Sequence, residues 1–480
     1  MAAQDPVAAT RRRAVSGFVL YDVANSAFVT VVVTALGGPF LSALADDAAR
    51  PDGRLSIGLL SPRADALFAY AVTVSVLLQV LALPVLGALA DRAGARRRLL
   101  ALATAVGAVA TVVLALVPGG LVLVGFAAFI VANVAFGAAL TTYNASLADV
   151  AELPDRDRVS SRGYAAGYAG GAVVLVVALV LVAAADPLGI SRGTAVRLSI
   201  GLAGLWWAAL GVVALRRLDA ADELPGRAPD VAAQEGLGRR LADVLAQLKG
   251  SLRALRALPG TAKYLLAFLL FNDAIQAVVA LSAVVLENEL FVAKGLPRDD
   301  ATPFLLQLIL LIQVVAVFGA SAAGRLAGRF GAKRVVLATL VIWTLILLYA
   351  VLALDSTTAA YGLGVAIALV LGGSQSLARS LFSAMTPRQR QASFFSFYEL
   401  AERGTAWIGS LIFAIVLDVT GSYRGAFASL LVLFVAGGLL LAATDTDAAI
   451  AAARETERRD EQTGTLTATG EEPEARGTAR

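Results

Sequence analysis

Gly87-Ala-Leu-Ala-Asp91-Arg92-Ala-Gly94-Ala-Arg96-Arg97-Arg98-Leu99 is a short segment of mixed charge between two apolar runs. Each run is long enough to cross a bilayer as a helix. A weaker copy, Gly324-Arg325-Leu-Ala-Gly328-Arg329-Phe-Gly331-Ala-Lys333-Arg334, also joins two long apolar runs. The glycines permit tight turns, and the cations favour the cytoplasmic side of a membrane. The repeat therefore predicts a membrane protein built from two related halves.

The composition supports this interpretation. The 480 residues are 58% hydrophobic and 16% charged, with a mean hydropathy of +0.76, which excludes a soluble domain. The net charge of +4 gives no indication of a nucleic-acid partner. Because the chain has no cysteine and no histidine, a thiolate metal site is excluded and any proton relay must use carboxylates. We expect no metal and no cofactor.

Twelve apolar runs are long enough to span the hydrocarbon core. We predict an all-α membrane protein with twelve transmembrane helices in two pseudo-symmetric six-helix halves, residues 1–215 and 262–443. The predicted spans are 16–44, 65–89, 99–117, 121–145, 163–185, 195–215, 262–287, 303–325, 334–354, 358–380, 393–417 and 424–443.

The charges of the loops orient these spans. With a cytoplasmic N-terminus, the inner segments before the tail hold 26 Lys and Arg residues, whereas the outer loops hold eight. Since Lys and Arg accumulate on the cytoplasmic side, we expect both termini to be cytoplasmic. We expect a multi-pass protein of the cell (plasma) membrane.

Two polar segments flank the second half. Residues 216–261 form a cytoplasmic linker, in which leucines from Leu237 to Leu255 recur at helical spacing among arginines and predict an amphipathic helix on the membrane surface. A solvated tether with incidental leucines is the alternative. The tail, residues 444–480, is rich in acids, Thr and Gly near its end and is predicted to be disordered.

Ionisable groups inside spanning helices are costly, so each is a functional candidate. Asp22 and Asn25 are three residues apart in the first span, and Asp273 and Gln276 have the same spacing in the seventh. Asp273 follows Asp22 by 251 positions, and Gln276 follows Asn25 by the same 251 positions, so the repeat preserves the pair. We predict that they face one cavity between the halves. The alternative is that they are structural caps that tie helix ends together.

Further polar residues lie in the tenth and eleventh spans. Glu399 and Arg403 are four apart and can pair, which leaves Glu402 as a separate acid. The alternative is an inert buried ion pair. Gln375 and Arg379 share a face, and Arg379 could bind a carboxylate, although an arginine so near the inner end can also snorkel to the membrane surface.

The fourth and fifth spans contribute tyrosines and glycines. Tyr143 and Asn144 end the fourth span, and Tyr164 and Tyr168 share a face of the fifth, where they could line a cavity or sit at the membrane interface. A ladder of glycines at four-residue spacing is predicted to let helices pack closely, and it consists of Gly163, Gly167 and Gly171.

The acids lie at a common depth. Asp22, Asp273 and Glu399 each follow an inner cation by nine or ten residues, which is ~14 Å at 1.5 Å per residue. This layer is in the cytoplasmic half, whereas substrates of such proteins usually bind near the midplane. The sequence therefore leaves open whether these acids form a gate or bind substrate.

The pattern G-x-L-A-D-R-x-G-x-R-R-R resembles the signature loop between the second and third helices of major facilitator superfamily transporters. In this chain the matching residues of that loop, which the resemblance implies is coupled to conformational change, are Gly87, Asp91, Arg92, Gly94 and Arg96. The second copy has Gly328 where the first has Asp91.

Longer patterns resemble the vacuole-effluxer branch of that superfamily, the autophagy-related vacuolar amino-acid exporters and their bacterial relatives. They are Tyr21, Asp22, Ala24, Asn25 and Ser26; Tyr143, Asn144, Ala145, Leu147 and Asp149; Arg158, Ser160, Gly163, Ala165, Gly167, Tyr168, Gly170 and Gly171; and Gly372, Gly373, Gln375, Leu377, Arg379, Ser380 and Phe382. The resemblance implies the major facilitator fold and export of neutral amino acids.

We predict a secondary active transporter that moves a small solute, foremost neutral amino acids or a similar metabolite, by alternating access. A drug or metabolite exporter of another branch and a non-transporting sensor or scaffold are the alternatives. We expect no enzyme activity, a monomer in the lipid bilayer, a small-molecule substrate, and a coupling proton carried by Asp22, Asp273 or Glu399.

Overall fold

The structure is a computed structural model, and it describes residues 6–58, 60–90, 95–151, 156–223, 255–256, 258–386, 398 and 407–469. The described residues are helical throughout, apart from short loops and two isolated bridges in the loop around residues 54–63. The predicted all-α class is therefore confirmed.

The described part of the first half contains one continuous helical run, Pro6–Asp47, and five further long helices. The helices of this half are α1 (Pro6–Ala27), the π-helix η1 (Phe28–Leu36), α2 (Gly37–Asp47), α3 (Leu67–Ala90), α4 (Ala95–Leu116), α5 (Val122–Ala145), α6 (Leu147–Val150), α7 (Arg156–Ala183), α8 (Arg192–Leu218) and the 3-10 turn η3 (Asp219–Glu223).

The second half repeats this order of long helices. Its helices are α10 (Pro259–Leu290), the 3-10 turns η5 (Val292–Lys294) and η6 (Arg298–Asp300), α11 (Ala301–Phe330), α12 (Ala332–Ala353), α13 (Thr357–Ala384), α15 (Ile408–Thr420), α16 (Tyr423–Ser429) and α17 (Leu431–Ala442), and it is followed by α18 (Thr446–Thr469).

Ten helical segments of the described chain are long and apolar enough to cross a membrane, and two shorter apolar helices, Leu67–Ala82 and Ile408–Thr420, fall where the second and eleventh spans are predicted. The predicted arrangement of twelve spans is consistent with these elements.

Glycine at the break between α11 and α12 has a structural reason, because Gly331 has a φ of +87° that other residues rarely adopt.

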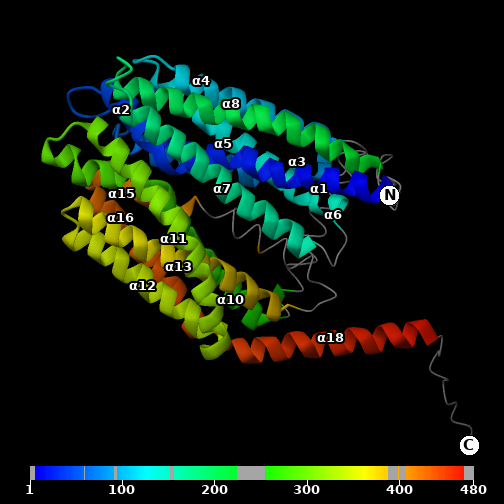
Figure 1. Ribbon diagram of the computed structural model, residues 1–480. Helices are drawn as coiled ribbons and strands as arrows, with labels where there is room; N and C mark the ends of the chain where they lie inside the picture. Colours follow the sequence, from blue (N-terminus) through cyan, green and yellow to red (C-terminus); the bar gives the residue numbers. More distant parts are fainter. Residues whose placement is uncertain are drawn as a thin grey trace, which may run out of the picture.

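The two halves lie side by side as separate bundles (Figure 1). In the first, α1 packs against α7 and α8, and α4 packs against α5 and α8. In the second, α13 packs against α11 and α12, and α10 packs against α17. The halves meet where α3 contacts α15, α7 contacts α11, and α2 contacts α10. The bundles are close near α2 and α15 and diverge toward the end that carries the N-terminus (Figure 1).

The π-helix η1 interrupts the first span. Residues 29–34, Val-Thr-Val-Val-Val-Thr, are six β-branched residues in a row, which crowd the turns of an α-helix. A π-helical segment inside an α-helix is uncommon and frequently marks a functional position. Here it places Thr30 and Thr34 beside the interface between the halves.

The linker prediction lies mostly outside the described residues, since 224–254 and 257 are not described. The tail differs from its prediction. Residues 446–469 form helix α18 instead of a disordered segment, and only 470–480 lie outside the described residues.

Helix α18 forms because its first turn is capped, a local feature that the polar composition of the whole tail does not reveal. Asp445 accepts a 2.9 Å hydrogen bond from the backbone N–H of Ala448, which caps the first turn. The run from Ala448 to Arg458 is rich in the helix formers Ala, Glu and Arg. Ala449 packs against Gly260 at the start of α10, so one side of the helix is buried.

Candidate functional site

A cavity of about 470 Å³ lies between the two halves. The first half contributes α1, η1, α5 and α7 to its wall, and the second contributes α10, α11, α12, α13 and α16. Its volume is within the range of small-molecule sites in proteins.

The polar side of the cavity comes mainly from a single stripe of the first span. Asp22, Ser26, Thr30 and Thr34 follow at four-residue steps along α1 and η1, and Asn25 lies beside Ser26 on the same side. The opposite wall is mostly aliphatic, with Ser282 and Gln313 as its polar members. Asp22 is the one charged side chain among the described lining residues, so the cavity has an acid and an apolar wall.

Asp22 is held by a tyrosine from α5. The hydroxyl of Tyr143 donates a 2.6 Å hydrogen bond to Oδ2 of Asp22. The Tyr143 ring is buried, and its centroid lies 4.3 Å from that of Phe18 and 5.0 Å from that of Tyr21. Tyr21 is fixed in turn by a 2.6 Å hydrogen bond with Thr104 of α4. This stack of three rings orients the carboxylate toward the cavity.

The glycine ladder of α7 is the surface on which α1 rests, which confirms its predicted packing role. A Cβ atom at Gly163 would overlap Oδ2 of Asp22, and one at Gly171 would lie 2.6 Å from Oγ1 of Thr30. Gly167 faces the backbone of Asp22 in the same way. Small residues are therefore required wherever the polar stripe passes α7.

Asn25 carries an unused hydrogen-bond donor at the cavity. Its side chain is 6% exposed, and its Nδ2 atom has no hydrogen-bond partner among the described residues. Leaving a buried amide donor unpaired costs free energy. A solute that supplies a carbonyl or carboxylate oxygen would recover this cost.

Asp273 occupies a different environment from its repeat partner. It is 1% exposed, is not among the described lining residues, and accepts a 2.6 Å hydrogen bond from the backbone N–H of Gly409. Since α15 begins at Ile408, this N–H belongs to the first turn of the helix and has no intrahelical acceptor. Asp273 therefore caps α15, which matches the structural alternative.

The repeat places both acids against glycines on the fifth helix of their half, Asp22 against α7 and Asp273 against α15. The outcome differs because α7 is continuous past Gly163, so its amides are bonded within the helix, whereas α15 starts beside Asp273. Gln276 is half-buried and, like Asp273, is not among the described lining residues.

The other predicted site residues are spread more widely. Tyr168 is 54% exposed and lines the cavity. Asn144 and Gln375 are half-buried and Arg379 is exposed, and the described cavity lining does not include them. Outside the described residues lie the side chain of Tyr164 and all of Glu399, Glu402 and Arg403.

The signature loop is described in part. Asp91, Arg92 and Gly94 lie outside the described residues, and Gly87 is in the last turns of α3. Nη1 of Arg96, at the start of α4, lies 2.8 Å from Oδ2 of Asp149 on α6. This ion pair joins two segments at the same end of the first half.

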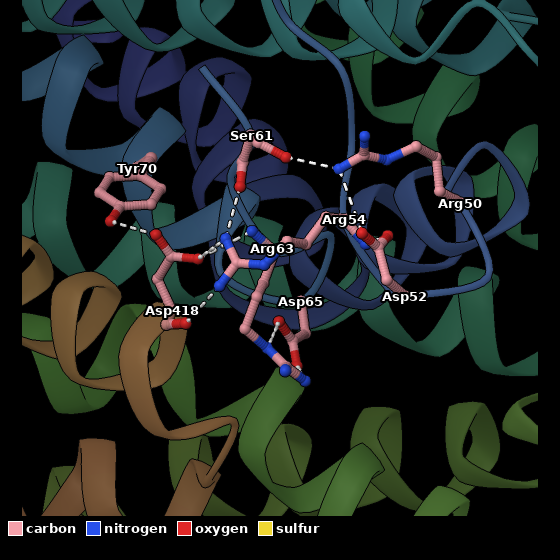
Figure 2. Close-up of polar contacts among 8 residues, drawn as sticks. All are labelled: Arg50, Asp52, Arg54, Ser61, Arg63, Asp65, Tyr70 and Asp418. Carbon is pink, nitrogen blue, oxygen red and sulfur yellow. Dashed lines mark hydrogen bonds and ion pairs between the residues drawn. The ribbon is translucent and has the colours of Figure 1, made fainter.

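A set of polar contacts that the sequence analysis missed joins the halves at the opposite end (Figure 2). Asp418 of α15 accepts hydrogen bonds from the backbone N–H of Arg63 at 2.8 Å and from the hydroxyl of Tyr70 at 3.3 Å. Nη1 of Arg54 lies 3.5 Å from the same carboxylate. A hydrogen bond to Asp65 raises the pKa of the Arg63 guanidinium above its ordinary value, so this cation stays charged. We call Arg54, Arg63, Tyr70 and Asp418 the outer clamp, because the charges of the loops predict that this end faces the outside.

A second group of ion pairs joins the two halves near the same end. Arg298 pairs with Asp46 of α2 and lies 3.2 Å from Glu287 of α10, so one guanidinium joins both halves. Arg192 pairs with Asp300 across the same boundary. The signal available in the sequence is the concentration of acids and arginines in residues 46–65 and 287–300, of which only the cations entered the prediction of topology.

Comparison with known proteins identifies the family. A family model described as vacuole effluxer Atg22 like matches residues 10–454. The chain belongs to this family. It is 26% identical over 429 residues to the MFS-type transporter YxiO of Bacillus subtilis, covering 89% of this chain and 94% of that protein. It is 28% identical over 302 residues to autophagy-related protein 22-1 of Neosartorya fischeri, covering 59% of this chain. The chain spans about half the length of this fungal relative.

Solved structures support the fold. A crystal structure of a D-xylose-proton symporter superposes with a TM-score of 0.63 at 15% sequence identity, over 90% of this chain and 97% of that one. Together with the family match, this shows a multi-pass membrane transporter of the major facilitator type, related to the Atg22 effluxers. Families of this kind are typically not enzymes.

Proposed function

We propose that the chain is a secondary active transporter that exports a small zwitterionic or neutral metabolite, foremost neutral amino acids, by alternating access of its two halves. The observation that carries the proposal is the cavity between the halves, with one acid and one unpaired amide donor on its polar side. The chain's relation to the Atg22 effluxers supports efflux as the activity.

The chemistry of the wall matches both ends of an amino acid. The carboxylate of Asp22 can accept hydrogen bonds from an ammonium group. Nδ2 of Asn25 can donate to the substrate carboxylate, and an aliphatic side chain can lie on the wall formed by α10 and α11. A polyanion is disfavoured because the described lining contains no Lys or Arg.

An apolar organic cation is the second candidate. Most of the described wall from the second half is aliphatic, including Val279, Leu286, Ile309 and Ile312. Asp22 would balance a single positive charge on such a solute. This candidate differs from an amino acid in needing no donor for a carboxylate, so Asn25 would be dispensable.

Alternating access follows from the placement of the closure. The outer clamp and Arg298 hold the halves together at one end, and the bundles diverge at the other (Figure 1). With both termini cytoplasmic, this is a conformation closed to the outside. Export then requires the outer contacts to break while the inner ends approach each other.

We propose that Asp22 also carries the coupling proton. It is the one acid among the described lining residues, and its hydrogen bond from Tyr143 changes when the carboxylate is protonated. Protonation of Asp22 would release the ammonium group of a substrate, which couples proton movement to solute movement. The chain would act as a monomer, since one copy encloses the cavity.

Transport into proteoliposomes tests the function. Purified protein is reconstituted, and counterflow of radiolabelled neutral amino acids and of an apolar organic cation is measured with and without a pH gradient. We expect amino-acid counterflow that Asp22→Asn abolishes and Asn25→Leu weakens, with no loss in Asp186→Asn, an exposed acid outside the cavity. Flux that is unaffected by Asp22→Asn and by collapse of the pH gradient would rule out the proposed coupling.

Orientation can be tested because the chain has no cysteine. We propose a plasma-membrane protein with cytoplasmic termini, so Asp186→Cys should react with an impermeant maleimide added to intact cells. Glu455→Cys should react only after the cells are opened. The reverse pattern would invert the topology.

A further inference from the structure

A second cavity, of about 880 Å³, lies at the end of the first half that carries the N-terminus. It is a groove between α1 and α7, with the end of α8 and the segment after α6 at its sides. The transport proposal above does not use it, and none of its described lining residues lines the central cavity. The two cavities share only helices α1 and α7.

The groove has a cationic rim. Four arginines from three helices line it, Arg11 and Arg12 from α1, Arg162 from α7 and Arg217 from α8. No acidic residue is among the described lining residues. Four arginines gathered around one groove repel one another, so a bound anion is favourable.

Three of these arginines lack an acidic partner among the described residues, namely Arg12, Arg162 and Arg217. Other arginines at the same end of this half are paired, since Arg96 contacts Asp149 and Arg97 contacts Asp219 at 2.9 Å. Of the described acids at this end, Asp149 and Asp219 are therefore directed to Arg96 and Arg97 and not to the groove.

The interior of the groove is apolar. Val15, Val19 and Val23 follow one another along α1 at four-residue steps, and Val159 of α7 faces them. From Val15 to Val23 the helix rises about 12 Å. The groove therefore continues from a cationic rim at the helix ends into an aliphatic channel that runs toward the middle of the spans.

We propose that this groove binds an anionic phospholipid, with its phosphate at the arginines and part of one acyl chain along the valines. Guanidinium groups bind phosphate oxygens in bidentate geometry, and basic pockets between transmembrane helices suit acidic lipid headgroups. A free anion would satisfy the arginines but would leave the valine channel unfilled. The site lies on α1, the helix that carries Asp22, so the lipid would hold α1 and α7 together near the cavity.

Lipid retention tests the proposal. The full chain is purified in a neutral detergent, phosphatidylglycerol or phosphatidylcholine is added, and bound lipid is counted by native mass spectrometry. We expect tighter binding of phosphatidylglycerol than of phosphatidylcholine. Arg12→Gln combined with Arg217→Gln should weaken phosphatidylglycerol binding about thirtyfold, since each cation near a lipid surface contributes roughly a factor of five.

Neighbouring arginines provide a matched control. Arg13→Gln combined with Arg216→Gln removes the same charge from exposed positions that do not line the groove. We expect this variant to bind phosphatidylglycerol like the wild type. Equal losses in the two double variants would show a general charge effect and overturn the site.

Two further results would also overturn it. Glycerol phosphate, which has no acyl chain, should not displace the lipid at equal concentration, and effective displacement would mean that the groove holds a free anion. Removal of residues 470–480, which include Glu471, Glu472 and Glu474, should leave lipid binding unchanged. If phosphatidylglycerol bound only after this removal, the acidic tail and not a lipid would be the natural occupant of the groove.

Discussion

Asp418 accepts a 2.8 Å hydrogen bond from the backbone N–H of Arg63, which lies 355 positions earlier in the chain and in the other half. The same carboxylate is within reach of Arg54 and Tyr70. Opening of the outer end must break these contacts together, because one side chain supplies the acceptor for all of them. Asp418 is therefore the position where a single change should alter the balance between the conformations.

We expect Asp418→Asn to shift the protein toward an outward-open state. Loss of the charge weakens the outer clamp by about 1–2 kcal/mol at this partly exposed position, which raises the outward-open population about fivefold to thirtyfold. Spin labels on Leu60→Cys and Thr358→Cys, exposed at the outer end of the two halves, should report longer distances. Asp52→Asn is the control, since Asp52 contacts Arg50 and Arg54 within one loop, and an equal shift in this variant would contradict the prediction.

Tyr143→Phe should reduce substrate affinity without unfolding the protein. The ring would keep its stacking against Phe18, but the donor to Asp22 would be lost, at a cost of about 1–2 kcal/mol in ordering the carboxylate. We expect counterflow to be half-saturated at about tenfold higher substrate concentration. Tyr21→Phe removes a hydroxyl from the same stack that bonds Thr104 instead, so it should change stability more than affinity. Equal affinity losses would refute a specific role for the Tyr143 hydroxyl.

Gly171→Ala should destabilise the first half. The added methyl would lie 2.6 Å from Oγ1 of Thr30, so α1 and α7 would have to separate, at a cost of about 1–3 kcal/mol. Thermal unfolding in detergent should show a midpoint lower by several degrees. Gly362→Ala is the matched control because its Cβ would meet nothing within 4 Å, and it should unfold at the same or a higher temperature. The packing argument fails if Gly171→Ala is neutral.

Asp273→Ala should lower the stability of the protein, whereas Asp22→Ala should abolish substrate binding. Removing Asp273 leaves the N–H of Gly409 unpaired, so we expect a loss of about 1–2 kcal/mol in stability with little change in substrate affinity. Removing Asp22 should abolish binding and affect stability less. Isothermal titration and thermal unfolding of both variants separate the two roles. Loss of substrate binding in a stable Asp273→Ala protein would show that Asp273 acts in transport and would contradict its role as a cap.

The spans were predictable because their signal is local. A run of about twenty apolar residues must cross the bilayer as a helix, whatever it packs against. The twelve predicted spans are consistent with the described helices, ten of which are long and apolar enough to cross a membrane. The glycine ladder of α7 was identified from its spacing alone. The tail was predicted less well, since a short cap at Asp445 outweighs the polar composition that suggested disorder.

The site was predicted only in part. The matched acids at Asp22 and Asp273 were found from the repeat, but their environments diverge because one neighbouring helix is continuous and the other begins at Ile408. The outer clamp was not predicted, since Arg54 and Asp418 are 364 positions apart and nothing in either segment indicates the other.

The sequence by itself determined the membrane class, the duplicated halves and the shared face of Asp22 and Asn25, because hydropathy and helical spacing act within a single segment. The tertiary structure alone decided which polar groups meet, so that Asp22 reaches the cavity, Asp273 caps α15, and Asp418 joins the halves. The physical reason is that a hydrogen bond requires two atoms about 3 Å apart, and packing between helices brings such partners together from distant parts of the chain.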